Sequence, residues 1–289
     1  MRIEKLVVIG VGLIGGSLAL ALKRRGVVGE IVGLGRRVET LEEAVSLGVI
    51  DRFDTDHSAV QGADLIFMGV PVGAMATQFE RIAPYINDRT TITDGGSTKQ
   101  HVIDDARQIL AGGASRFVPG HPIAGSERSG VAAANAALFD KHTVLLTPLP
   151  ENDPSIIEQV TRMWQYTGAC VETMDPVKHD RILGLTSHLP HILAYTLVDF
   201  IARGDNAERC FDLAAGGFFD FTRIASSDPI MWRDITVTNR ESLSESIGDF
   251  IERLSALKEL VDQERADEIE SLYRFAREAR NRLVDKRKS

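Results

Sequence analysis

The feature that most constrains the fold is a glycine pattern near the N-terminus, GVGLIGG, which lies between a β-branched run and an apolar helical stretch. Gly10, Gly12 and Gly15 have the spacing GxGxxG, with Leu13 and Ile14 between the last two. The first glycine allows a tight turn, the second lets the backbone approach a pyrophosphate, and the third permits close helix–strand packing. The pattern predicts that these five residues bind a dinucleotide at a helix N-terminus. The alternative is a merely tight strand–helix turn.

The end of the next predicted strand bears on the choice of nucleotide. Residues 30–37 read EIVGLGRR, so Gly35 is followed by Arg36 and Arg37. An NAD-binding unit usually has an acid there for the ribose diol, whereas arginines would bind the 2′-phosphate of NADP. The sequence therefore favours NADP. NAD use stays open if the arginines are only solvated surface charges.

Further strand-like runs recur at 63–71, 89–97, 115–122 and 141–148, with helical patterns between the first few. This alternation predicts a mostly parallel, doubly wound α/β sheet of the Rossmann type. Ligands of such sheets collect at the carboxyl ends of the strands, where Val70, Pro71 and Asp94 fall. We expect these three residues at the cofactor crevice, and Gly120 and His121 beside them.

From about Pro176 the strand signals vanish and amphipathic helical patterns take over. The sequence predicts a dinucleotide-binding domain over residues 1–175 and an all-helical domain over residues 176–289. A helical domain of this length often forms dimers, so we expect substrate binding and a homodimer interface there.

Composition excludes several classes of partner. With 33 basic and 41 acidic residues, the net charge of -8 makes a nucleic-acid partner unfavourable. No window reaches the roughly 18 apolar residues of a membrane span. Cys170 and Cys210 have no CxxC spacing, which argues against a zinc site or a disulfide framework. We therefore expect a cytoplasmic protein that acts on a small molecule.

Four stretches carry more polar residues and glycines than packing requires: DGGSTK (94–99), GHPIAGSE (120–127), TSHLPH (186–191) and GGFFDFTRIASSDPIMW (216–232). Together with GVGLIGGS, they resemble the prephenate and arogenate (cyclohexadienyl) dehydrogenase family of tyrosine biosynthesis, from about residue 5 to about residue 260. The resemblance implies NAD(P)-dependent oxidative decarboxylation. Prephenate would give 4-hydroxyphenylpyruvate, and arogenate would give tyrosine.

His121, in HPIAG, matches the catalytic histidine of that family. The reaction requires a base at the ring hydroxyl, and an imidazole that titrates near neutrality suits this role. Two alternatives are a histidine held by backbone hydrogen bonds and a metal ligand. No second ligand stands at zinc-binding spacing, so we expect no metal. Ser97 matches the serine that hydrogen-bonds the same substrate hydroxyl.

Arg223, in DFTRIA, matches the family's substrate-binding arginine. A guanidinium offers the bidentate geometry that a carboxylate prefers, and an unpaired charge in apolar sequence would be costly. A structural ion pair is the alternative. Asp220 and Glu127 match acids that form an ionic gate with this arginine, and helix capping competes with that role.

His191 and Trp232 complete the expected substrate site. By resemblance, His191 reaches the substrate side chain, and its presence favours prephenate. Trp232 resembles a tryptophan that covers the site, and an aromatic anchor between helices is an equal alternative. His188 is expected to pack or hydrogen-bond without contacting substrate. The remaining histidines are expected to be structural or solvated: His57, His101, His142 and His179.

Two rival functions remain. One is another dehydrogenase with a Rossmann and a helical domain, of the β-hydroxyacid type, which would lack HPIAGSE together with TRIASSDP. The other is a nucleotide-sensing module without catalysis, which would not need a base and a carboxylate-binding arginine. Nucleotide reduction in the presence of substrate separates an enzyme from a sensor.

Overall fold

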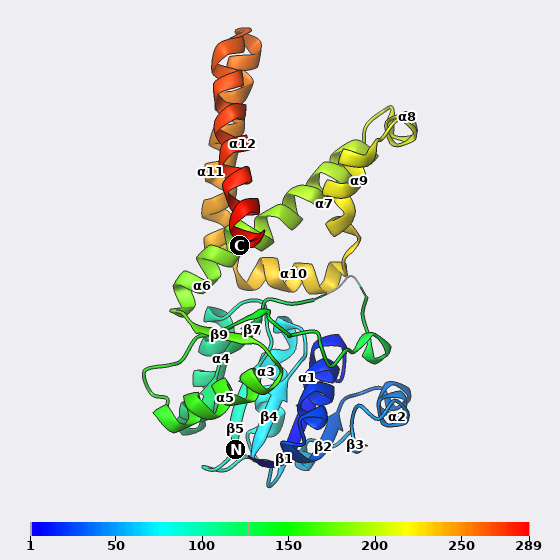
Figure 1. Ribbon diagram of the computed structural model, residues 1–289, viewed down its shortest axis with the longest axis vertical. Coiled ribbons are helices and arrows are strands. Elements are labelled where there is room, and N and C mark those ends of the chain that lie inside the picture. Colours follow the sequence, from blue (N-terminus) through cyan, green and yellow to red (C-terminus); the bar gives the residue numbers. More distant parts are fainter. Residues whose placement is uncertain (1, 126–127, 289) are drawn as a thin grey trace. The chain divides into compact units, whose positions relative to one another are not determined.

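A computed structural model describes residues 2–125 and 128–288 of the chain. The chain divides into two compact units, Met1–Arg240 and Glu241–Ser289. Helices and strands are labelled in Figure 1. The functional boundary expected between residues 175 and 176 stays a prediction.

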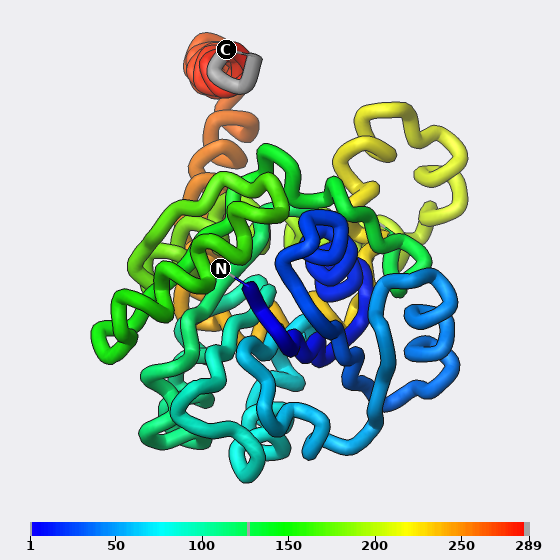
Figure 2. The backbone as a smooth tube through the Cα atoms, turned by 60° about the horizontal axis from the view of Figure 1, so that its bottom comes forward, coloured from blue at the N-terminus to red at the C-terminus, as the bar shows by residue number. Residues whose placement is uncertain are grey.

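The first unit is built on a parallel sheet with the strand order β3-β2-β1-β4-β5-β6. Its strands are β1 (Ile3–Ile9), β2 (Val28–Leu34), β3 (Arg52–Asp54), β4 (Leu65–Met68), β5 (Thr91–Asp94) and β6 (Phe117–Val118). β1 pairs in parallel with both β2 and β4, so the N-terminal strand lies inside the sheet, as Figure 2 shows. The expected doubly wound α/β sheet is confirmed.

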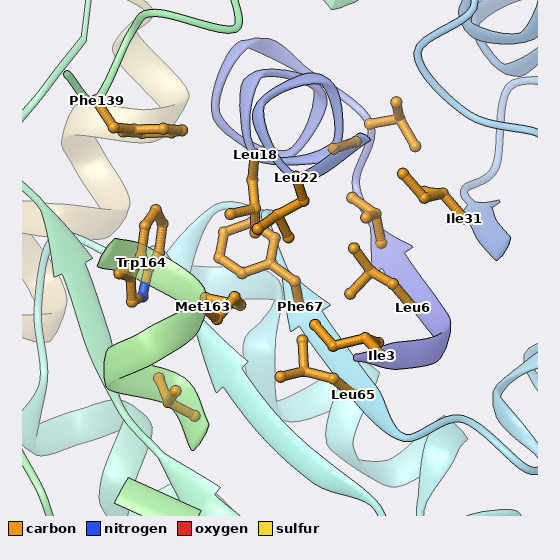
Figure 3. Packing of buried hydrophobic residues seen from close by; sticks show 14 of the residues in the cluster. Ile3, Leu6, Leu18, Leu22, Ile31, Leu65, Phe67, Phe139, Met163 and Trp164 are labelled. Carbon is orange, nitrogen blue, oxygen red and sulfur yellow. The ribbon is translucent and has the colours of Figure 1, made fainter. Parts of the chain in front are cut away.

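Helices cover both faces of this sheet. They are α1 (Leu13–Arg24), α2 (Val38–Ser46), α3 (Met75–Ile82), α4 (Gln100–Leu110) and α5 (Pro154–Tyr166). Leu18 and Leu22 of α1 pack with Met163 and Trp164 of α5 on one face, where Phe67 meets Trp164 edge to face (Figure 3). Side chains of α3 and α4 fill the core on the other face. Because both faces are buried, the strands read as apolar runs.

Residues 115–122, expected as one strand, are divided between two sheets. β6 ends the parallel sheet, and β7 (Gly120–Pro122) begins a second sheet with β8 (Thr143–Leu146) and β9 (Cys170–Thr173). β7 runs antiparallel to β8, and β8 is parallel to β9. Pro119 separates β6 from β7, and a proline cannot donate a ladder hydrogen bond. His121 therefore follows the carboxyl end of β6 but belongs to the smaller sheet.

The rest of the first unit is helical: α6 (Pro176–Leu183), α7 (Leu189–Ala202), α8 (Ala207–Asp212), α9 (Gly216–Thr222) and α10 (Pro229–Thr238). A π-helical turn, η5 (Gly184–His188), joins α6 to α7. Pro190 follows this turn and lacks the N–H that a regular α-helix would use. The sequence SHLPH therefore lies inside a continuous helical path.

The second unit contains most of α11 (Arg240–Asp262) and all of α12 (Ala266–Lys288). Glu264 turns the chain between these helices with a φ of 53°. Throughout the described part of the chain, no helix combines the length and apolarity needed to cross a membrane.

The turn between β1 and α1 has the geometry that its glycines predict. Gly10 has a φ of +89°, a conformation that disfavours other residues. A Cβ at Gly15 would lie 2.4 Å from the carbonyl oxygen of Gly10 and 2.8 Å from Val8 Cγ1. At Gly12 it would meet no described atom within 4 Å. Gly15 is thus required by packing, whereas Gly12 leaves open space.

We expect Gly15→Ala to lower the free energy of unfolding by about 1–3 kcal/mol, the usual cost of forcing atoms into a packed interior. Gly12→Ala is the control, because its methyl group enters open space. Urea denaturation measures both. Equal stabilities for the two variants would contradict the assigned packing role of Gly15.

Candidate active site

A cavity of about 760 Å³ opens beside the glycine turn. Its lining includes Gly10, Gly12, Arg36, Arg37 and Pro71. Val70 also lines it, while Leu13 and Ile14 begin α1 next to the turn. The open space over Gly12 and the N-terminus of α1 suit a pyrophosphate, and both arginines are exposed at the end of β2. These residues fit a dinucleotide, and their individual roles stay predictions.

A buried ion pair lies at the carboxyl end of β5. The Asp94 and Lys99 side chains are both fully buried, and Lys99 Nζ contacts Asp94 Oδ2. Asp94 also accepts hydrogen bonds from the backbone N–H of Gly96 (2.8 Å) and of Gly120 (2.9 Å). Lys99 Nζ donates to the carbonyl of Gly120 at 2.8 Å. These contacts of Asp94 and Lys99 therefore connect the loop that carries Ser97 to the strand that carries His121. The described contacts of Asp94 are structural, and its expected contact with cofactor stays a prediction.

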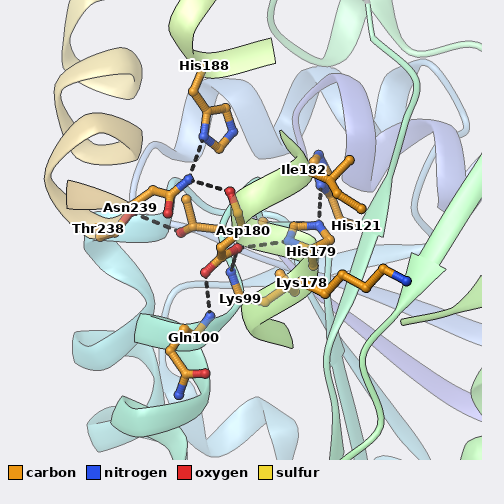
Figure 4. A network of polar contacts seen from close by, with 12 residues as sticks. Lys99, Gln100, His121, Lys178, His179, Asp180, Ile182, His188, Thr238 and Asn239 are labelled. Atoms are coloured by element: carbon orange, nitrogen blue, oxygen red, sulfur yellow. Dashed lines mark hydrogen bonds and ion pairs between the residues drawn. The ribbon is translucent and has the colours of Figure 1, made fainter. Parts of the chain in front are cut away.

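His121 is half-buried on β7 and contacts a second histidine. Its Nδ1 lies 2.9 Å from Nε2 of His179, whose ring is fully buried in α6. His179 Nδ1 lies 2.8 Å from Asp180 Oδ1. Figure 4 shows this row of three side chains. Among the described residues, the His121 ring therefore has a side chain as its hydrogen-bond partner, whereas one alternative expected backbone partners.

Asp180 also joins α6 to α4. Its Oδ1 accepts from the backbone N–H of Lys99 at 2.8 Å, and its Oδ2 accepts from that of Gln100 at 2.9 Å. A carboxylate in this position satisfies free N–H groups at a helix N-terminus and complements the helix dipole. Asn239 Nδ2 donates to the Asp180 carbonyl at 2.9 Å and lies 3.0 Å from His188 Nδ1. The expected hydrogen-bonding role of His188 agrees with this contact.

Burial and neighbouring positive charge favour neutral imidazoles at this site. Burial is the largest cause that holds the pKa of His121 well below 6.5, and the charge of Lys99 lowers it further. Burial lowers the pKa of His188 to about 4. At neutral pH, His121 is therefore available as a base.

His191, Trp232 and Arg223 lie close together. The rings of His191 and Trp232 stack with centroids 3.6 Å apart and an interplanar angle of 18°. Burial lowers the pKa of His191, and the charge of Arg223 lowers it further. Arg223 itself is exposed, although its neighbours in sequence are apolar, and its expected role stays a prediction. Phe219 and Phe221, two apolar residues that precede it, are also exposed (60% and 45%).

Three further residues are expected at the substrate site. Asp220 is exposed on α9, one turn before Arg223. Glu127 lies outside the described residues. Ser97 is half-buried in the loop between β5 and α4. The roles of all three stay predictions.

Sequence reasoning missed His179 and Asp180 as neighbours of His121. The available signal was DPVKHD, in which Asp175 and Pro176 start a helix and place His179 and Asp180 in its first turns. Asp175 caps that helix by accepting from Lys178 N at 3.0 Å. The pairing with His121 depends on tertiary structure, which adjacency in sequence does not reveal. In the described ranges, no group of three or more metal-ligating side chains could hold a metal ion.

Comparison with protein families gives two matches that cover most of the chain. Residues 18–173 match the model described as prephenate dehydrogenase, nucleotide-binding domain. Residues 175–275 match the prephenate dehydrogenase dimerization domain.

Individual proteins that are similar to this chain agree with these family matches. The prephenate dehydrogenase of Bacillus subtilis is 38% identical over 97% of this chain and 76% of its own length. A cyclohexadienyl dehydrogenase of Zymomonas mobilis is 33% identical over 96% of this chain and 95% of its own. The crystal structure of prephenate dehydrogenase from A. aeolicus, in complex with hydroxyphenyl propionate and NAD+, has a TM-score of 0.93 and 37% identity, covering 98% of this chain and 99% of that one.

We expect Lys99→Met to lower the free energy of unfolding by about 3–5 kcal/mol, because it leaves the Asp94 carboxylate buried without its cation. Lys258→Met removes a lysine from an exposed pair with Asp262 and should change stability little. Chemical denaturation of both variants measures the difference. A Lys99 variant as stable as the Lys258 variant would show that the buried pair does not hold the site together.

Proposed function

The chain belongs to the prephenate dehydrogenase family, and we propose that it oxidatively decarboxylates prephenate with NADP as its preferred nucleotide. NAD(P)-dependent oxidoreductase activity follows from the family match over nearly the whole chain. The preference for prephenate and NADP, and the role of each residue, are the proposal. The observation that carries it is the placement of His121. Its Nδ1 lies 2.9 Å from His179 Nε2, and the backbone N–H of the adjacent Gly120 donates to Asp94, which begins the Ser97 loop.

The reaction requires a base that can also return a proton. The substrate ring has one carbon with a hydrogen and a hydroxyl, opposite a carbon with a carboxylate. When bound, the nicotinamide accepts the ring hydrogen as hydride. The hydroxyl proton moves to His121, and the C–C bond electrons of the departing carbon dioxide enter the ring. His121 then returns the proton to the phenolate oxygen, so there is no net proton change.

The other side chains bind and orient the substrate in this proposal. Ser97 hydrogen-bonds the hydroxyl that His121 deprotonates. Arg223 binds a substrate carboxylate, supported by its electrostatic effect on the adjacent His191. His191 contacts the substrate side chain from its stacked position on Trp232, which closes the site. Asp220 and Glu127 form the gate with Arg223.

Gly10, Gly12 and Pro71 would hold the nucleotide in the cavity that they line. Arg36 and Arg37 border this cavity where the adenosine ribose would lie in a Rossmann-type site. Their two positive charges support binding of a 2′-phosphate. NAD would be bound without that ion pairing.

Arogenate is the second candidate substrate. The Synechocystis arogenate dehydrogenase structure is 29% identical to this chain, has a TM-score of 0.82 and covers 97% of this chain and 100% of that one. Prephenate and arogenate differ only in a keto or an amino group on the side chain. His191 near Arg223 supports the keto substrate, because an ammonium group there would meet another cation.

The proposal also includes a homodimer formed through residues 176–289, with residues 1–175 as the nucleotide-binding domain. Large apolar side chains exposed on this helical part support it, including Phe200 (75%), Phe219 (60%) and Phe275 (70%). The free, exposed Cys170 and Cys210 support a reducing, cytoplasmic location.

His121→Asn should reduce kcat by about 10²–10⁴-fold and leave nucleotide affinity unchanged, because only the proton transfer is lost. The wild-type value of kcat/KM should stay constant as the pH falls to 6.5 and decline only below it. His121 must be unprotonated to accept the proton, and its lowered pKa keeps the imidazole unprotonated in mild acid. Steady-state rates across pH and nucleotide titration by fluorescence test this. Normal turnover of the variant would remove His121 from its role.

The substrate and nucleotide preferences are tested by steady-state assays of prephenate and arogenate, each with NAD and NADP. We expect the highest kcat/KM for prephenate with NADP. Replacing Arg36 and Arg37 by glutamine should raise the KM for NADP more than that for NAD. A higher kcat/KM with arogenate or with NAD would overturn that part of the proposal, and inactivity with all four pairs would overturn the activity itself.

A further inference from the structure

We propose that His179 and Asp180 are positioning residues that keep His121 in the tautomer protonated on Nδ1, so that Nε2 acts as the base. The inference deepens the proposed function and rests on His121 being the base. It starts from the row of side chains His121, His179 and Asp180 in Figure 4.

The donor and acceptor of each hydrogen bond in the row can be assigned by starting from Asp180. Backbone N–H groups can only donate, and those of Lys99 and Gln100 point at Oδ1 and Oδ2 of Asp180. Both carboxylate oxygens therefore act as acceptors. His179 Nδ1, which lies 2.8 Å from Oδ1, must then be the protonated nitrogen and donate to it.

The next two steps follow along the row. A neutral His179 with its proton on Nδ1 has an unprotonated Nε2, which is an acceptor. Nδ1 of His121, at 2.9 Å, must supply the proton for that contact. A neutral His121 then has its lone pair on Nε2. The partners of one ring nitrogen thus determine which nitrogen performs the chemistry.

Burial makes this arrangement rigid. The His179 ring has no exposed surface and Asp180 is 4% exposed, so water does not compete for their hydrogen bonds. His179 follows the Asp175-Pro176 helix start, and its backbone N–H donates to the Asp175 carbonyl at 2.8 Å. Asp180 is fixed by the N-terminus of α4, the same helix that follows the Ser97 loop. One carboxylate therefore links the position of that loop to the tautomer of His121.

A protonated His179 would have the opposite effect. Both of its ring nitrogens would donate, so Nδ1 of His121 would accept and its Nε2 would carry the proton. That form of His121 could not accept the substrate proton at Nε2. The proposal therefore requires His179 to be neutral in the active enzyme.

The direct test is ¹H–¹⁵N correlation spectroscopy of the full-length wild-type protein labelled with ¹⁵N in its histidine rings, near neutral pH, with and without NADP. The His121→Asn and His179→Gln variants assign the signals. We expect both histidines to be protonated on Nδ1 and unprotonated on Nε2, the minor tautomer of histidine free in water. A proton on Nε2 of His121, or on both nitrogens of His179, would overturn the proposal whether or not the enzyme is active.

A pair of variants tests the consequence for catalysis. His179→Leu removes the acceptor, whereas the amide of His179→Gln can accept from His121 and donate to Asp180. We expect His179→Leu to lower the pH-independent plateau of kcat at least about tenfold, with an unchanged KM for NADP. His179→Gln should recover most of that loss. His142→Leu, at an exposed histidine, is the control.

Two kinetic results would contradict the proposal. A His179→Leu plateau equal to that of the wild type would show that the tautomer needs no support. A folded His179→Gln no better than His179→Leu would show that the acceptor is not what matters. If His179→Leu does not fold, the spectra of the wild type still decide the tautomer. Normal turnover of His121→Asn would instead refute the underlying function, so the two failures are distinguishable.

Discussion

The site depends on one buried carboxylate. Asp94 lies at the end of β5 with no exposed surface, and it binds the ammonium of Lys99 and two backbone N–H groups. A charge in the interior is tolerated only when such partners surround it. The partners come from the loop after β5 and from β7, so satisfying this charge fixes both segments. The position of the Ser97 loop is thereby coupled, through a charge in the core, to the strand that carries His121.

The fold could be predicted from the sequence to the extent that local patterns determine it. The glycine turn, the parallel sheet and the change to helices near Pro176 each follow from periodicity or from a steric rule, and each is confirmed. The division at Pro119 was not foreseen, because β6 and β7 differ in their pairing partners and not in their composition. The π-helical turn before Pro190 could not be predicted either, because the apolar periodicity of the segment is that of an ordinary helix.

The candidate site could be predicted where residues belong to motifs, as for His121, Ser97 and Arg223. His179 and Asp180 belong to none of those motifs, and their importance arises from contacts between α6, β7 and α4. The exposure of Arg223 could not be read from its neighbours either. Apolar residues in short helices can be exposed to solvent in a single chain. The sequence shows how these residues are spaced, but it does not show which face of the helix another surface covers.

The π-helical turn η5 sets the angular position of the residues after it. Each residue of an α-helix advances the chain by about 100° around the axis, so one residue more or less before α7 would rotate that whole helix. His191 would then leave the face on which it stacks against Trp232. A relative that lost a single residue at 184 or 185 could keep the TSHLPH motif and still place a different side chain against Trp232. The length of this segment therefore decides, together with the identity of its residues, which side chain stacks on Trp232.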